Sequence, residues 1–85
     1  SLTPDDPFIL DSKGWLLFRQ GNFAAALEIL RKAYVEKPDA EIAAHIGEVL
    51  WVLDRPNEAL AIWREATKAH PTNEALAATI KRFVP

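Results

Sequence analysis

The chain contains an internal repeat, and this feature limits its possible folds more than any other. A shift that brings Gly14 onto Gly47 also places Gly14–Pro38 on Gly47–Pro71 without a gap, and eight of these 25 pairs are identical. Most of the identical residues are small or apolar, as repeated packing contacts require: Gly14/Gly47, Leu17/Leu50, Ala26/Ala59, Leu27/Leu60, Ile29/Ile62, Arg31/Arg64, Ala33/Ala66 and Pro38/Pro71. A period of this length indicates stacked supersecondary units rather than one irregular core.

Each copy predicts two helices, because helix-breaking residues divide it in the middle and at its end. We expect helices that begin at Asp6-Pro7, Asn22, Asp39-Ala40, Pro56-Asn57 and Thr72-Asn73, with Asp6, Asn22, Asp39 and either Thr72 or Asn73 as N-caps. No segment alternates with period two over the length of a strand. The predicted fold is therefore all-α and a single domain over 1–85, with repeat one at about 7–39, repeat two at about 40–72 and a capping helix at about 73–84.

The small residues predict where the helices approach closely. Gly14 and Gly47 lie inside helices, where glycine costs about 1 kcal/mol relative to alanine. Close approach of the partner helix would compensate, and Ala26 and Ala59 are expected to face the two glycines. In the last helix, Leu76, Ile80 and Phe83 form a single apolar stripe, which is what a terminal cap requires.

The first helix is apolar on almost every side. Its large residues form three stripes, Phe8/Trp15, Ile9/Leu16 and Leu10/Leu17, which are spaced about 100° apart around the helix axis. Such a helix should be covered on more than one side. Two explanations remain open: repeats precede this segment in a longer protein, or two copies form a homodimer through the N-terminal helix.

The pattern Leu10…Gly14…Leu17…Gly21-Asn22-Phe23…Ala26…Leu30…Ala33…Pro38 resembles a tetratricopeptide repeat (TPR), and Ile46-Gly47…Leu50…Ala59…Trp63…Ala66…Pro71 resembles a second copy. The resemblance covers about Pro7 to Pro71, although Asp54-Arg55-Pro56 replaces the family's usual Gly-x-aromatic turn. It implies two helix-turn-helix hairpins of a right-handed α-solenoid that acts as a scaffold for protein–protein interaction.

In this family the concave surface of the first helices usually binds the partner. Carried over to this chain, that surface comprises Phe8, Asp11, Ser12, Trp15, Arg19, Glu41, Ala44, His45, Glu48 and Val52. Asp11, Trp15 and Ala44 stand where the family's clamp for a terminal carboxylate has Lys, Asn and Lys, so this device is not expected. The groove would suit an extended or helical segment with apolar anchors and Lys or Arg. The alternative is a structural C-terminal cap and self-association module of a longer protein, in which Phe8 and Trp15 pack against a neighbouring repeat.

Composition and spacing argue against other classes of function. The chain has no cysteine, and His45 and His70 have no metal-ligand spacing. Neither a phosphate-binding loop nor a nucleophile with a base at a suitable spacing is visible, so we expect no catalysis and no cofactor. The net charge of −2 and the scattered Lys and Arg residues predict no nucleic-acid binding and no direct membrane contact.

A narrower resemblance is carried by the segments Asp11-Ser12-Lys13-Gly14-Trp15 and Gly47-Glu48-Val49-Leu50-Trp51. They look like the C-terminal repeats of long bacterial TPR proteins, several of which are outer-membrane lipoproteins facing the periplasm. Some of those act as adaptors for a periplasmic carboxyl-terminal processing protease. The resemblance favours the periplasm or outer membrane over the cytoplasm, and the polar start without Met leads us to expect a fragment of a longer protein.

Overall fold

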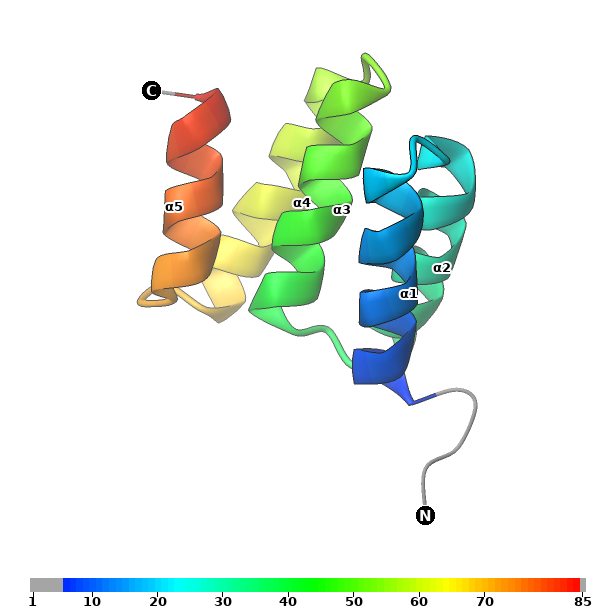
Figure 1. Cartoon of the computed structure of the whole chain (residues 1–85). Coiled ribbons are helices and arrows are strands. Elements are labelled where there is room, and N and C mark those ends of the chain that lie inside the picture. Colours follow the sequence, from blue (N-terminus) through cyan, green and yellow to red (C-terminus); the bar gives the residue numbers. More distant parts are fainter. Residues whose placement is uncertain (1–5, 85) are drawn as a thin grey trace.

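The computed structural model describes residues 6–84, and over this range the chain forms five α-helices and no strand. This confirms the all-α prediction. Consecutive helices run antiparallel and are joined by short turns (Figure 1). The helices are α1 (Pro7–Arg19), α2 (Phe23–Glu36), α3 (Ala40–Val52), α4 (Pro56–Ala69) and α5 (Glu74–Phe83).

Three of the four predicted N-caps are made. The side chains of Asp6, Asp39 and Asn73 accept hydrogen bonds from backbone N–H groups in the first turns of α1, α3 and α5, at 2.9, 3.0 and 2.8 Å. The prediction for Asn22 is wrong, since its side chain makes no capping bond. Its ψ of 68° differs from the extended values of Asp39 and Asn73, 147° and 116°, and the tight turn before α2 imposes this difference.

The turns within the two hairpins have the same backbone geometry although their sequences differ. Gly21 and Asp54, which occupy equivalent positions of the two repeats, both have positive φ, 86° and 62°. The N–H of Gly21 donates to Phe18 O, and the N–H of Asp54 donates to the carbonyl of Trp51, the equivalent residue. Asp54 therefore adopts the left-handed conformation for which glycine is the ordinary choice.

Each helical glycine makes room for a large side chain of the partner helix. A Cβ on Gly14 would lie 2.6 Å from Leu30 Cγ, and a Cβ on Gly47 would overlap the ring of Trp63. We expected Ala26 and Ala59 to face the two glycines. Only the Ala26 backbone comes near, with its carbonyl oxygen 3.4 Å from where the Gly14 Cβ would be. The closest contacts are made one helical turn further along. Leu30 and Trp63 occupy equivalent positions of the two repeats and are almost fully buried.

The helices form two layers, with α1, α3 and α5 side by side in one and α2 and α4 behind them (Figure 1). We call the outer surface of α1, α3 and α5 the front face. Helix α3 lies between α1 and α5, and nine of its 13 residues are buried. The apolar stripe of α5 packs on the core as predicted, with Leu76 buried and Ile80 and Phe83 partly buried. No helix within 6–84 is long and apolar enough to cross a bilayer.

Candidate functional site

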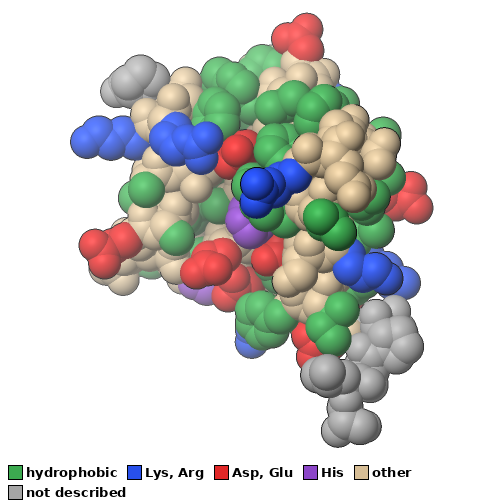
Figure 2. All heavy atoms as spheres, viewed as in Figure 1, with side chains coloured by type: hydrophobic (Ala, Val, Ile, Leu, Met, Phe, Trp, Pro, Cys, Tyr) green, Lys and Arg blue, Asp and Glu red, His purple; other side chains and the backbone are tan. Residues whose placement is uncertain are grey.

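The front face has a polar and aromatic cluster where α1 meets α3. Asp11 Oδ1 lies 2.7 Å from His45 Nδ1, and the Trp15 ring stacks on the His45 ring with centroids 4.2 Å apart. Phe18 continues the stack behind Trp15, at 4.7 Å. Figure 2, which views this face, shows acidic side chains gathered around a histidine near its middle. We call Asp11, Trp15 and His45 the front cluster.

The front cluster is partly open to solvent. The side chains of Asp11 and His45 are 16% and 26% exposed, and Trp15 is half-buried. An incoming side chain can therefore reach the edge of the stacked rings, whereas the hydrogen bond fixes the orientation of the imidazole. Three residues that were placed on this surface from sequence are thus brought together by direct contacts.

Glu48 differs from the expectation for a groove residue, because it is 7% exposed. Its Oε1 lies 3.4 Å from Arg82 Nη1 of α5, which covers it. Arg82 was not predicted as a site residue. The spacing of 34 residues between Glu48 and Arg82 is the same as that between Asp11 and His45, so a search for charge pairs near the repeat length could have found it.

The prediction of Ala44 on this surface is wrong, since Ala44 is 3% exposed and lies in the core, where its carbonyl accepts from Trp63 Nε1. The remaining predicted site residues are exposed side chains outside the front cluster. The Phe8 ring lies 5.7 Å from Lys37 Nζ, and Ser12 Oγ donates to the Phe8 carbonyl at 3.1 Å. The remaining exposed members are Arg19, Glu41 and Val52. Whether these residues bind a partner stays a prediction.

The arrangement of side chains on the front face is suited to binding a partner surface, and the contacts shown do not form a reaction centre. The Asp11–His45 pair lacks a nearby nucleophile among the contacts that the structure shows, and Ser12 donates to a backbone carbonyl of its own helix. Within residues 6–84, no group of three or more His, Cys, Asp or Glu side chains could hold a metal ion. A stacked aromatic pair beside a fixed polar group is suited to contact with an apolar or aromatic side chain of a partner.

Comparison with known proteins supports a helical-repeat assignment. A tetratricopeptide repeat family model matches residues 17–82. A TPR repeat-containing protein of Pseudomonas aeruginosa is 57% identical over 47 residues, which are 55% of this chain and 8% of that protein. Tetratricopeptide repeat protein 1 of Schizosaccharomyces pombe is 34% identical over 65 residues, 72% of this chain and 6% of that protein. The chain thus matches less than a tenth of the length of either relative.

Proposed function

The chain belongs to the tetratricopeptide repeat family, whose repeats are generally non-catalytic scaffolds for protein–protein interaction, and we propose that it binds a peptide segment of a partner across the front face. The observation that carries this proposal is the front cluster. Its stacked Trp15 and His45 rings lie at the junction of two first helices and remain accessible to solvent. Aromatic side chains in such positions often dominate the binding energy of an interface.

The contacts also refine the expected chemistry of the partner. Two of the acids on this face are already paired, Asp11 with His45 and Glu48 with Arg82. The face is therefore less able to select Lys or Arg than the acidic residues of the sequence suggested. We propose that apolar or aromatic anchors of the partner contact Trp15 and that Glu41, which is exposed, supplies a weaker preference for a basic residue at the edge.

A selection from a random peptide library tests this function without requiring that the natural partner be identified. Peptides that bind the immobilised 85-residue chain are titrated into isotope-labelled protein, and amide shifts are mapped by NMR. We expect the shifts to concentrate at Asp11, Trp15 and His45. Trp15→Ala should weaken binding by about tenfold or more. Lys68→Ala, at an exposed site on α4, should leave binding unchanged. A selection in which no peptide shifts the front cluster would contradict the proposal.

A second candidate function, a structural cap that associates through α1, is favoured by a difference in burial. Leu16 is 57% exposed, whereas Val49, the equivalent residue of repeat two, is 0% exposed. Ile9 is partly exposed, and its equivalent Ile42 is fully buried. The side of α1 that corresponds to the buried side of α3 therefore lacks a covering element among residues 6–84.

Sedimentation of two variants tests this candidate. If α1 pairs with a second copy, Leu16→Glu should turn dimer into monomer, whereas Val35→Glu, on an 82% exposed apolar residue of α2, should not. A wild-type chain that is monomeric at every concentration would rule out self-association. Trp15 is unsuitable for this test because it faces His45 of the same chain.

We also propose that the chain forms the C-terminal part of a longer bacterial protein that is attached to the outer membrane and faces the periplasm, where it serves as an adaptor. The narrower sequence resemblance supports the compartment and the adaptor role, and the match to 8% of a Pseudomonas protein supports only a longer bacterial parent. Fractionation of cells and protease treatment of spheroplasts test it. Recovery in the cytoplasmic fraction would refute it.

A further inference from the structure

A hollow lies apart from the front face, where α2 meets the turn between α3 and α4. Its volume is about 460 Å³, which is within the range of pockets that hold ligands. Residues of α2 and of the α3–α4 turn line it: Ala24, Leu27, Glu28, Arg31, Leu53 and Arg55. None of them belongs to the predicted front-face site. We call this hollow the seam pocket.

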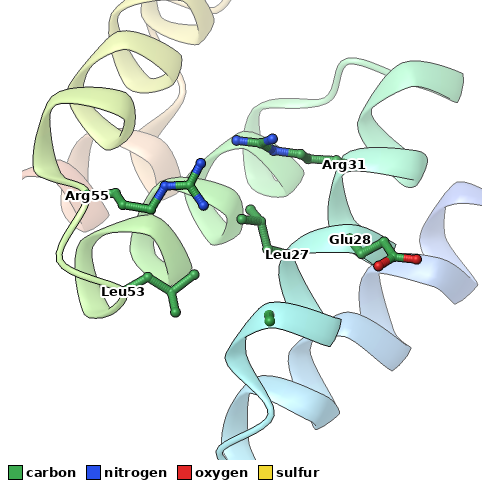
Figure 3. A pocket seen from close by; sticks show the side chains of 6 residues that line it. Leu27, Glu28, Arg31, Leu53 and Arg55 are labelled. Atoms are coloured by element: carbon green, nitrogen blue, oxygen red, sulfur yellow. The ribbon is translucent and has the colours of Figure 1, made fainter.

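The seam pocket combines an apolar floor with a cationic rim. Leu27 is almost fully buried and Leu53 is partly buried, and together they form the floor. Figure 3 shows Arg31 and Arg55 extending from opposite walls toward one another above these leucines, while the Glu28 carboxylate points away from the hollow. An apolar group in the pocket would therefore lie directly beneath two guanidinium groups.

The carboxylate of Glu58 in α4 already contacts both arginines of this rim. Arg55 donates to it twice, through Nε at 2.5 Å and Nη2 at 2.7 Å, and Arg31 Nη2 lies 3.6 Å from Oε1. The hydrogen bonds from Arg55 hold the pKa of Glu58 below its ordinary value, so this carboxylate is ionised at neutral pH. One carboxylate thus faces two cations.

The two arginines retain capacity for a second acidic group. A guanidinium has five N–H donors in a planar fork. Glu58 takes two of those on Arg55 and approaches Arg31 at a distance longer than a charged hydrogen bond. A carboxylate placed between the guanidinium groups could engage the remaining donors of both.

We propose that the seam pocket binds an acidic segment of a protein partner, with an apolar side chain on the Leu27–Leu53 floor and the carboxylate of a neighbouring Asp or Glu at Arg31 and Arg55. Charge complementarity at the rim selects the acid, and burial of the apolar group supplies the attraction. The net charge of −2 and the presence of Glu28 and Glu58 beside the arginines disfavour a polyanion such as nucleic acid. The site does not depend on the function proposed for the front face.

Three blocked tetrapeptides, acetyl-Gly-Leu-X-Gly-amide with X as Glu, Gln or Lys, test the chemistry. Each is titrated to about 10 mM into the isotope-labelled 85-residue chain, because short probes typically bind in the millimolar range. With X as Glu, we expect saturable shifts at the amides of Leu27, Leu53 and Arg55. The Gln peptide should bind at least about threefold more weakly, and the Lys peptide more weakly still. Equal binding of the Glu and Gln peptides, or no saturable shift with any of them, would overturn the proposal.

Variants then separate the pocket from general charge effects. Arg31→Gln should weaken binding of the Glu peptide by about tenfold. Arg64→Gln should leave it unchanged, since Arg64 is the equivalent exposed residue of repeat two and does not line the pocket. Glu58→Gln should tighten binding because it removes the internal competitor. An equal loss with both arginine variants, or weaker binding with Glu58→Gln, would refute the site; far-UV circular dichroism checks that each variant is folded.

Discussion

Gly47→Ala should destabilise the fold strongly, although alanine is the better helix former. The added Cβ would overlap Nε1 and Cε2 of Trp63 and lie 2.7 Å from Cδ1. Trp63 cannot move away easily, because it is 1% exposed and its ring packs against Trp51 and Phe83 at 5.9 and 5.8 Å. The substitution therefore tests how closely α4 approaches α3.

The expected change in the free energy of unfolding follows from two opposing effects of the substitution. Alanine gains about 1 kcal/mol in helix propensity. Overpacking of a rigid core typically costs about 1–3 kcal/mol and occasionally more, and the complete loss of a buried tryptophan side chain, about 3–5 kcal/mol, sets an upper limit. We expect a net loss of about 2–4 kcal/mol, since part of the strain can relax. This is a large part of the total of roughly 4–13 kcal/mol that is usual for a domain of this length.

Urea denaturation followed by far-UV circular dichroism measures the effect. Gly14→Ala is the matched control: its Cβ would meet Leu30, a smaller side chain, at 2.6 and 2.8 Å, so its loss should be smaller. In the double variant Gly47→Ala/Trp63→Leu, the cost of the added methyl group should fall to about that of Gly14→Ala, whose Cβ also meets a leucine. If Gly47→Ala is as stable as the wild type, or the cost is unchanged beside Trp63→Leu, the close approach of α4 to α3 is wrong.

Three smaller effects are expected. Asp54→Gly should raise the free energy of unfolding by up to about 1 kcal/mol, because it relieves the positive φ of 62°, and a lower urea midpoint would contradict this reading. Asn73→Ala should cost about 1 kcal/mol through loss of the cap on α5, with a matched Thr72→Ala change having little effect in the same assay. The pKa of Glu58 is lowered by Arg55, so its stabilising effect is present above the ordinary carboxyl pKa and is lost as the pH falls. The difference in urea midpoint between wild type and Glu58→Gln should therefore shrink from about pH 7 to about pH 3, and a growing difference would refute the assignment.

The sequence was sufficient for the architecture because the repeat supplies the same information twice. A gapless period that keeps the helix breakers in step, with Pro38 on Pro71, leaves little choice of helix order or boundary. The side chains that contact the two helical glycines were harder to predict from the sequence. Ala26 and Leu30 lie one turn apart on the same side of α2, and periodicity alone does not say which of them is level with Gly14.

The contacts between hairpins were harder still. Pairing of Asp11 with His45 depends on how α1 and α3 are rotated about their own axes, and the burial of Glu48 depends on where α5 docks. The seam pocket joins α2 to the α3–α4 turn, which no helical period brings together. These features arise from packing between elements, so a pattern within one element contains no direct signal for them.

The position of α5 that is equivalent to Gly14 and Gly47 bears on how further repeats could stack on this chain. The interval that separates Gly14 from Gly47, taken once more, leads to Ile80 in α5. At the first two positions the missing side chain is the socket into which the following helix inserts Leu30 or Trp63. On α5 an isoleucine stands at the equivalent position, and its side chain is partly buried against the core. A further hairpin stacked on α5 in the same manner would meet a branched side chain where α1 and α3 each have a glycine, and Ile80→Gly would remove that side chain.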